Sequence, residues 1–425
     1  MNEKTRLFIE RNLNADIRQL ALQGSKDSEV DLPLALRQIA GRQTARRKLP
    51  SWAALDGLLF PPHLNMEQCS SEQTARYKAD ICRRLLETHH DSPFTHHEPP
   101  VTLHPSPFTN LVDLTGGFGV DFSWMSKAFD EATYVERDSE LFAISSHNFG
   151  LVNFVNSVKT LNMDGIDYLH RLSHATVIFL DPARRDDKGA RTYGIADCTP
   201  NVLEIKDELL QKSDFLILKL SPMLDWRKAI SDLGEQYVHE VHIISVQNEC
   251  KELLLVLSAS QPAPPYALFT INLLSDGTSQ QFQVPSPTSL HQSPVTLHQS
   301  PVTLHQYLYE PNASIMKAGC FQELAQHYSV QPLAPNSHLF VSEQPIADFP
   351  GRSFQISAIS SMNKKELKTV LSDIHSANIT TRNFPLSVAD LRKKLKLADG
   401  GNVYIFATTL ANNQHVLIVC RVSVG

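Results

Sequence analysis

The chain has 425 residues, which is more than one hydrophobic core usually serves, so we expect two to four domains. Hydrophobic residues make up 42% and charged residues 20% of the chain, a balance that is typical of globular proteins and excludes a largely disordered chain. The 39 basic and 45 acidic residues give a formal net charge of -6. The overall charge therefore does not indicate a polyanionic partner, although a local basic patch can still bind nucleic acid.

The first ninety residues are predicted to form a helical domain. Asp31 is a typical N-cap, and the apolar residues that follow it recur at helical spacing. Ser70 and Gln73 form a capping-box pattern before a predicted helix over 74–86. The basic cluster 41–48 between these helices is interpreted as a solvated helix face.

Residues 91–108 are rich in Pro and His and are predicted to be a linker. Two pairs of histidines, at 89–90 and 96–97, invite comparison with a metal site. A zinc site needs a shaped and closed set of ligands, which a segment broken by prolines is poorly suited to form. The six cysteines are scattered without a close pair, as expected for reduced thiols. We therefore expect no metal and no disulfide.

The location of the protein is inferred from two negative signals. No apolar run approaches the roughly 20 residues that a membrane-spanning helix needs. The N-terminal segment 1–12 lacks the apolar core of an export signal. Together with the cysteine usage, these features predict a cytoplasmic protein.

Between residues 111 and 257, short apolar runs alternate with helical stretches, as is typical of βαβ units and a largely parallel sheet. The candidate helices start near Val120, Ser139, Gly165, Val202 and Leu224. The candidate strands are 111–114, 133–136, 154–158, 177–180, 215–220, 241–246 and 253–257. Because only a short polar turn separates the last two strands, they are predicted to form an antiparallel hairpin that closes the sheet edge.

The remaining third of the chain begins with segments 266–274 and 278–284, which flank an Asp-Gly turn and are predicted to form a hairpin. A tandem repeat of seven residues follows at 286–306. Because the repeat is short, polar and rich in Pro, we interpret it as an expanded surface loop and not as a solenoid. A small α/β unit ends the chain, with strands predicted at 354–359, 403–408 and 416–421 and helices at 364–375 and 387–395.

The strongest functional signal is the segment 111–121, LVDLTGGFGVD. A predicted buried strand enters a glycine-rich turn and leads into a helix, an arrangement that lets the backbone approach a ligand closely. The glycines have the spacing G-G-x-G and not the G-x-G-x-x-G of a dinucleotide fingerprint. The segment resembles motif I of the class I S-adenosylmethionine (SAM) methyltransferases. That resemblance implies a cofactor site containing Asp113, Thr115, Gly116, Gly117 and Gly119.

Acidic residues recur where the next predicted strands end. Glu136 follows the second strand, where a carboxylate can accept hydrogen bonds from two ribose hydroxyls. Asp164 follows the third strand, where the class I family has an acid or amide near the adenine, and Asp181 ends the fourth. Each acid alone is equally well explained as a helix N-cap. Because ligands of open α/β sheets bind at the carboxyl ends of the strands, we expect these acids and Asp113 to converge on one SAM site.

The segment DPARR at 181–185 stands where amino-methylating class I enzymes carry [D/N]PP[Y/F]. In those enzymes the acid or amide and the proline carbonyl hold the target amine, and the aromatic ring stacks on the base. This chain departs from the motif, because Ala183 replaces the second proline and an arginine stands in the aromatic position. The resemblance implies candidate catalytic residues Asp181, Pro182 and Arg184, with Tyr193 as a substitute for the aromatic residue and Arg185 as a phosphate contact.

The same segment is similar to the DPPR motif of uridine C5-methyltransferases, which need a cysteine nucleophile after the fifth strand. Here residues 219–223 read Lys-Leu-Ser-Pro-Met, and the nearest cysteine, Cys198, is interpreted as structural. Methylation of nitrogen or oxygen is therefore favoured over methylation of carbon. We expect Asp181 to orient the nucleophile or accept its proton, and Lys219 is a candidate substrate contact.

Longer segments resemble the bacterial THUMP-like-domain methyltransferases, often found in Bacteroidetes, over nearly the full length of the chain. They are residues 37–52, 63–79, 112–121, 179–185, 218–225, 310–321 and 381–397. The resemblance implies an α/β fold with a class I methyltransferase core, built on a Rossmann-like seven-stranded sheet. It also implies an N-terminal helical domain and C-terminal ferredoxin-like and THUMP-like modules.

The domain boundaries that we expect combine this resemblance with the composition. They are 1–90 for the helical domain, 91–108 for the linker, 109–262 for the core, 263–350 for the ferredoxin-like module interrupted by the repeat 286–306, and 351–425 for the THUMP-like domain. The resemblance further implies that N-terminal helices cover the cofactor through Gln68, Ser71, Thr74 and Tyr77.

THUMP modules accompany the modification of tRNA and rRNA, so the resemblance implies an RNA partner. The basic strip 392–396 fits an RNA footprint, with Arg392 and Lys393 as candidate contacts, and fits a solvated helix face equally well. Our leading hypothesis is a SAM-dependent methyltransferase that modifies a base nitrogen in structured RNA, either tRNA or rRNA. The alternatives are a methyltransferase of a protein or small molecule, a non-catalytic SAM- and RNA-binding scaffold, and a nicotinamide-dependent dehydrogenase, for which the G-x-G-x-x-G motif is missing.

Overall fold

The computed structural model describes residues 1–90, 108–152, 154, 156–184, 194–259, 265–284, 306–334 and 336–422. The chain divides into two compact units, which are Met1–His239 with Leu254–Pro264, and Glu240–Leu253 with Pro265–Gly425. Residues 91–107 of the predicted linker and 286–305 of the predicted repeat loop lie outside the described residues. Among the helices of the described ranges, none combines the length and the apolar character needed to cross a bilayer.

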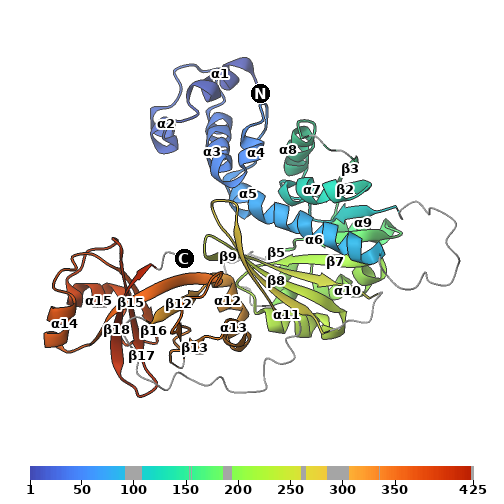
Figure 1. Cartoon of the computed structure of the whole chain (residues 1–425). Coiled ribbons are helices and arrows are strands. Elements are labelled where there is room, and N and C mark those ends of the chain that lie inside the picture. The colour runs from blue at the N-terminus through green and yellow to red at the C-terminus, as the bar shows by residue number, and fades with distance from the viewer. Residues whose placement is uncertain are drawn as a thin grey trace, which may run out of the picture. The chain divides into compact units, whose positions relative to one another are not determined.

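The N-terminal segment is helical, as predicted (Figure 1). Its helices are α1 (Glu3–Arg11), α2 (Ile17–Gln23), α3 (Leu32–Lys48), α4 (Pro50–Ala53), α5 (His63–Gln68) and α6 (Glu72–His90). Asp31 caps α3, because its side chain accepts a hydrogen bond of 3.1 Å from the Leu34 amide. Helix α6 begins at Glu72, two residues before the predicted start at 74, and Ser71 Oγ accepts a 3.2 Å hydrogen bond from the Thr74 amide.

The basic cluster at the end of α3 is not simply solvated, as we had interpreted it. Arg42 donates to the carbonyl of Leu55, and Lys48 donates to the carbonyls of Met66 and Glu67. The long aliphatic parts of these side chains let the cations reach carbonyl groups of neighbouring segments. The sequence alone does not indicate that these segments lie nearby.

The first sheet has nine strands in the order β11-β10-β8-β9-β7-β4-β1-β2-β3. Its strands are β1 (Asn110–Asp113), β2 (Glu131–Glu136), β3 (Ser157–Asn162), β4 (Ala175–Leu180), β7 (Ser213–Leu220), β8 (Val238–Val246), β9 (Glu249–Leu257), β10 (Ala267–Leu273) and β11 (Ser279–Val284). The strands β3, β2, β1, β4 and β7 pair in parallel, and all six residues of β4 are buried, as a strand covered on both faces requires. The predicted α/β fold and its seven-stranded core are confirmed, and β10 and β11 extend that core.

The helices that follow these strands start close to the predicted positions. They are α7 (Val120–Met125), α8 (Ser139–Phe149), α9 (Gly165–Arg171), α10 (Val202–Gln211) and α11 (Trp226–Leu233). The prediction for β3 was wrong by three residues, because Phe154 is not part of the strand and packs its ring against Phe122 and Phe149. An apolar residue that joins an aromatic cluster next to a strand has the same sequence signature as a strand residue.

The predicted hairpin β8–β9 exists, but it does not close the sheet edge. β10 pairs in parallel with β8, and β11 pairs antiparallel with β10 and becomes the edge strand. The segment 266–284 is therefore a hairpin, as its Asp-Gly turn predicts, and it belongs to the first sheet.

The second sheet has seven strands in the order β13-β14-β12-β15-β18-β17-β16. They are β12 (Tyr307–Pro311), β13 (Gln331–Pro332), β14 (Phe340–Ser342), β15 (Gly351–Ser361), β16 (Asn378–Arg382), β17 (Val403–Thr409) and β18 (His415–Val422). Helices α12 (Ala313–Ala318), α13 (Phe321–Tyr328), α14 (Lys364–Val370) and α15 (Val388–Leu395) accompany them. The strand β16 was not predicted, and α14 ends five residues earlier than the predicted 364–375.

Candidate functional site

The glycine turn begins directly after β1 and leads into α7. Gly117 and Gly119 have φ angles of 57° and 79°, in the left-handed region that favours glycine. A Cβ atom on Gly116 would lie 2.2 Å from the Tyr134 ring, so this position of the turn is closed to any side chain. The amide of Gly116 donates a 2.9 Å hydrogen bond to the carbonyl of Val135, which fixes the turn against β2.

Glu136 ends β2 beside this turn. Its Oε2 accepts a 2.8 Å hydrogen bond from the Gly117 amide, and its Oε1 accepts a 2.7 Å bond from the Asp138 amide. Both carboxylate oxygens are thus oriented by the backbone, which supports a fixed acceptor for hydroxyl groups at the carboxyl end of β2.

Asp113 ends β1 and is 1% exposed. Burial raises its pKa well above the ordinary value, and the charges of Asp121, Asp181 and Glu136 act in the same direction, while the bond from the Thr115 amide opposes them. Thr115 also links two strand ends, because its Oγ1 accepts a 2.7 Å hydrogen bond from the Asp181 amide. The structure therefore brings the acids of β1, β2 and β4 together.

Asp164 acts as the N-cap of α9, with its Oδ1 accepting a 2.8 Å bond from the Ile166 amide. The next residue, Gly165, packs so closely on Leu114 that a Cβ atom there would lie 2.1 Å from the Leu114 carbonyl oxygen. Asp164 therefore lies next to the end of β1. It can cap α9 and still lie beside a cofactor bound at the strand ends.

The segment DPARR, residues 181–185, follows β4. Pro182 is buried, and the short strand β5 (Ala183–Arg184) pairs antiparallel with β6 (Cys198–Thr199). Cys198 is 4% exposed, which fits the structural role that we expected for it. The side chain of Arg184 and the residues Arg185 and Tyr193 lie outside the described part of the structure.

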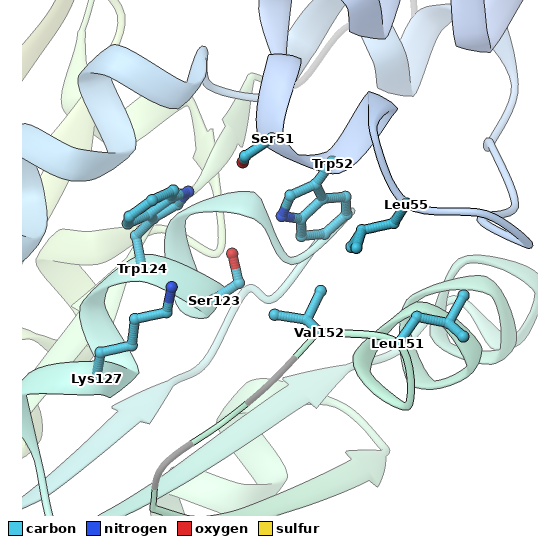
Figure 2. Close-up of a pocket in the computed structure, with 8 residues that line it drawn as sticks. All are labelled: Ser51, Trp52, Leu55, Ser123, Trp124, Lys127, Leu151 and Val152. Carbon is cyan, nitrogen blue, oxygen red and sulfur yellow. The ribbon is translucent and has the colours of Figure 1, made fainter.

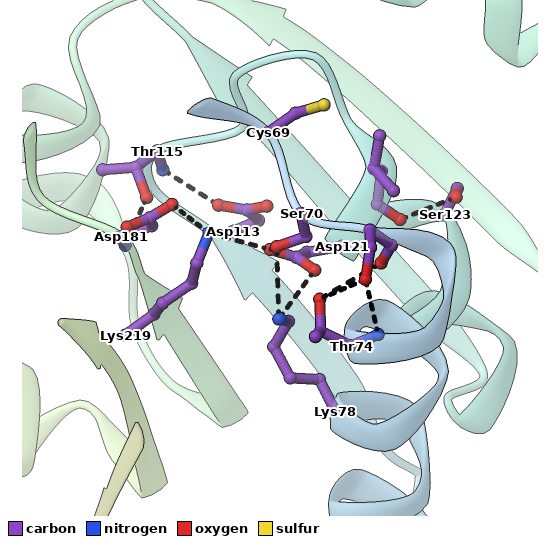
Figure 3. A network of polar contacts seen from close by, with 12 residues as sticks. Cys69, Ser70, Thr74, Lys78, Asp113, Thr115, Asp121, Ser123, Asp181 and Lys219 are labelled. Carbon is purple, nitrogen blue, oxygen red and sulfur yellow. Dashed lines mark hydrogen bonds and ion pairs between the residues drawn. The ribbon is translucent and has the colours of Figure 1, made fainter. Parts of the chain in front are cut away.

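A chain of alternating charges extends from Asp181 into the protein interior (Figure 3). Lys219 Nζ lies 2.6 Å from Asp181 Oδ2 and 3.4 Å from Asp121 Oδ2. Lys78 Nζ lies 3.1 Å from Asp121 Oδ1, and the Ser70 hydroxyl donates a 2.7 Å hydrogen bond to Asp121 Oδ2. Lys219 was predicted as a substrate contact, whereas the structure shows it buried between two carboxylates.

Sequence reasoning missed Asp121, Lys78 and Ser70. Burial opposes the ionisation of Asp121, but the charges of Lys78 and Lys219 and the hydrogen bonds from Ser70 and Lys78 together lower the Asp121 pKa below its ordinary value. A signal existed for Lys78, since it follows Thr74 by one turn and stands beside Ala75 and Ala79 on the buried face of α6. A lysine on an apolar helix face requires a buried partner.

Cys69 is a half-buried cysteine beside this row of charges. Burial raises its pKa to about 11, so the thiol stays protonated near neutral pH despite the nearby cations Lys48 and Lys219. The predicted cofactor-covering residues lie on the same segment, where the buried Thr74 and Ser71 hydrogen-bond to each other.

A separate cavity of about 230 Å³ lies between α4, α7 and the segment after α8 (Figure 2). It is lined by Ser51, Trp52, Leu55, Ser123, Trp124, Lys127, Leu151 and Val152. Lys127 Nζ lies 4.1 Å from the centroid of the Trp124 ring, over its face. None of the predicted site residues lines this cavity.

The basic strip on α15 belongs to the second unit. The Arg392 guanidinium donates to the carbonyls of Ala377 and Ala398 and to the carboxylate of Asp399, so it stabilises its own module. Lys393 is exposed. Among the described residues, no group of three or more His, Cys, Asp and Glu side chains is arranged to hold a metal.

The strand-end site fits SAM in its chemistry. The carboxylates of Glu136 and Asp181 lie beside the glycine turn, and SAM carries a sulfonium and an ammonium group that suit negatively charged neighbours. The carboxylate of Glu136 suits the ribose hydroxyls, and the turn formed by Gly116, Gly117 and Gly119 lets the cofactor approach the backbone.

Comparison with known proteins decides the family. A ferredoxin-like domain model matches residues 307–350, and a THUMP domain-like model matches residues 351–422. This chain is similar to a proposed methyltransferase from Porphyromonas gingivalis W83, whose crystal structure is known. The two sequences are 31% identical, and the structures align over 100% of this chain and 99% of the other chain with a TM-score of 0.82. The chain belongs to this methyltransferase family.

A second relative agrees with this assignment. An uncharacterised SAM-dependent methyltransferase from Mycobacterium tuberculosis strain CDC 1551 is 20% identical over 317 residues, which are 73% of this chain and 81% of the relative. The chain is thus a SAM-dependent methyltransferase with SAM as its cofactor. The resemblance to the THUMP-like-domain methyltransferases and the predicted class of enzyme are confirmed.

Proposed function

We propose that this methyltransferase transfers the methyl group of SAM to a base nitrogen in structured RNA. The observation that carries the proposal is the position of Asp181 at the carboxyl end of β4, with its amide on Thr115 Oγ1 at 2.7 Å and its Oδ2 on Lys219 Nζ at 2.6 Å. The side chain of Asp181 keeps 38% of its surface exposed. It is therefore held in place by Lys219 and remains accessible to a substrate.

When bound, SAM supplies an activated methyl group on a sulfonium centre. The chain then has to hold an amine in line with that methyl and remove its proton. Bound SAM would supply the methyl group to the nitrogen lone pair, and its sulfonium sulfur would take back the electron pair of the methyl–sulfur bond, which would give S-adenosylhomocysteine as the product. Asp181 accepts a hydrogen bond from the amine N–H and takes up the proton that the nitrogen loses.

Nitrogen is the favoured acceptor atom because the site has no suitable thiol for carbon methylation. Residues 219–223 at the end of β7 contain no cysteine, the described Cys198 is buried, and the pKa of the half-buried Cys69 is raised to about 11. An exocyclic amine or ring nitrogen needs only an acceptor and a fixed geometry, which Asp181 and Pro182 offer.

RNA is the favoured substrate class because residues 351–422 match a THUMP-like domain, and THUMP modules accompany the modification of tRNA and rRNA. A methyltransferase must reach an edge of the base, which in RNA is accessible in loops, bulges and extruded nucleotides. Structured RNA that displays such a base is therefore the substrate that we expect.

The test uses RNA from a strain that lacks the gene, because its target position is unmethylated. Purified protein and deuterated-methyl SAM are incubated separately with this RNA, with the protein fraction and with the small-molecule fraction of the same cells. We expect the label in one methylated nucleoside, identified by mass spectrometry, and an approximately 100-fold or greater loss with Asp181→Ala. Label in the protein or small-molecule fraction alone contradicts the proposal.

A further inference from the structure

Lys78 is a lysine of the N-terminal helix α6 with a fully buried side chain. Its exposed fraction is 0%, and its ammonium lies 3.1 Å from Asp121 Oδ1 and 3.2 Å from Ser70 Oγ. Removing two charges from water costs several kcal/mol per ion, and an apolar pair of similar volume is often as stable or more stable. Stability alone therefore does not explain why this pair is ionic.

The pair is one end of a chain that leads to the proposed reacting centre (Figure 3). The charges alternate along Lys78, Asp121, Lys219 and Asp181, which come from α6, α7, β7 and the end of β4. The exposed fraction of the side chain is 0%, 10%, 9% and 38% along this order. This row of charged side chains is therefore shielded from water at Lys78 and exposed to water at Asp181.

The position of the Asp181 carboxylate depends on the charge of Lys78, because the two residues are linked through Asp121 and Lys219. With both lysines present, Asp121 has two cations against it, and Lys219 lies closer to Asp181, at 2.6 Å, than to Asp121, at 3.4 Å. Without the ammonium of Lys78, Asp121 keeps only one of the two lysines that lie against it, and that lysine, Lys219, also lies against Asp181. Because attraction is stronger where water is excluded, the more buried Asp121 then draws Lys219 away from Asp181.

We propose that Lys78, supported by Ser70, is a positioning residue for methyl transfer, which acts through Asp121 and Lys219 to fix the carboxylate of Asp181. The N-terminal helical segment is then part of the active site. This inference rests on the proposed function only in assuming that Asp181 contacts the target nitrogen.

The first test is structural and does not depend on the substrate. In a crystal structure of Lys78→Met, which keeps the length of the side chain and removes its charge, we expect Lys219 Nζ to move off Asp181 and towards Asp121. If Lys219 remains within hydrogen-bonding distance of Asp181, the inference is wrong, whatever the enzyme methylates. If Lys78→Met does not fold, Ser70→Ala removes one hydrogen bond from the same Asp121 and should give a smaller shift of Lys219 in the same direction.

The second test is kinetic and uses total RNA from a strain lacking the gene. We expect Lys78→Met to lower kcat about 10- to 100-fold, with the KM for SAM and the affinity for S-adenosylhomocysteine nearly unchanged, and Lys78→Arg to restore part of the rate. In an Asp181→Ala background the Lys78→Met change should lower the rate no further, because both act on one group. Arg83→Met, an exposed position on the same helix, is the matched control.

The pH profile separates positioning from a purely structural role. Among the described residues, the charged or titratable groups that face Asp121 are Lys78, Lys219, Cys69 and Asp113, and those that face Asp181 are Lys219 and Asp113. With Lys219 drawn away, Asp181 loses a cation, so the acid limb of kcat should move to higher pH in Lys78→Met. A lower kcat with an unchanged acid limb of the pH profile would refute the inference. So would a Lys78→Met change that lowers kcat as much in the Asp181→Ala background as in the wild type. Failure of the proposed function is recognised separately, because the wild-type protein would then not label RNA.

Discussion

The amide of Gly117 donates a 2.8 Å hydrogen bond to Oε2 of Glu136, which joins the glycine turn after β1 to the end of the adjacent strand β2. The bond keeps the carboxylate over the turn before any ligand arrives. A preoriented acceptor loses less conformational freedom on binding, which is the physical basis for high affinity from few contacts.

The first prediction concerns this carboxylate. We expect Glu136→Gln to weaken the binding of S-adenosylhomocysteine about 10- to 100-fold, because hydrogen bonds to a charged acceptor contribute about 1.5 to 3 kcal/mol. Isothermal titration calorimetry measures the affinity. Glu131→Gln, at the amino end of the same strand, should bind like the wild type. Equal affinities of Glu136→Gln and wild type would remove Glu136 from the cofactor site.

The second prediction concerns the backbone of the turn. Gly119 has a φ of 79°, and a Cβ atom there would lie 2.4 Å from the Phe149 ring, so Gly119→Ala combines backbone strain with a steric clash. Gly277→Ala is the control, because its φ is 87° and nothing lies within 4 Å of the added Cβ. We expect Gly277→Ala to lower the thermal midpoint by a few degrees and Gly119→Ala to lower it at least twice as far. Equal shifts would show that the clash is relieved without cost.

The third prediction follows from the raised pKa of Asp113. An acid whose pKa is higher in the folded than in the unfolded protein stabilises the fold fully below its unfolded pKa, and this contribution falls as pH rises through the folded pKa. Asp113→Asn retains an oxygen for the Thr115 amide and cannot ionise. We therefore expect the thermal midpoint of Asp113→Asn minus that of the wild type to increase between pH 5 and pH 8.

The control for that series is Asp207→Asn, because Asp207 is exposed on α10. Its difference from the wild type should stay constant over the same pH range. A difference for Asp113→Asn that falls with rising pH would mean that Asp113 is stabilised in its ionised form.

The fourth prediction separates two residues of the α15 strip. Because Arg392 donates to two carbonyls and to Asp399, Arg392→Ala should lower the thermal midpoint, whereas the exposed Lys393 should tolerate Lys393→Ala. We expect Lys393→Ala to weaken binding to total tRNA about 2- to 5-fold and to reduce the salt dependence by roughly one counterion. Filter binding at several salt concentrations measures both quantities. Unchanged affinity and slope would exclude Lys393 from the RNA surface.

The order of elements was largely predictable, since alternation of apolar strands with helices and the Asp-Gly turn are local signals. The acids Asp113, Glu136 and Asp181 were also recognisable, because parallel strands place their carboxyl ends along one edge. Errors arose where a side chain serves a distant partner. Apolar spacing predicts a strand at Phe154, whose ring packs in an aromatic cluster, and the local pattern around Ser70 does not indicate that its hydroxyl donates to Asp121.

The sequence by itself determined the class of fold, the glycine turn and the carboxylates around it, because these depend on residue type and on spacing within one βαβ unit. Only the tertiary structure decided that Lys78 and Lys219 are buried against Asp121 and Asp181. Charges separated by 43 and 98 positions along the chain meet through the packing of α6 and β7 around α7, and no local pattern records which buried cation neutralises which buried acid.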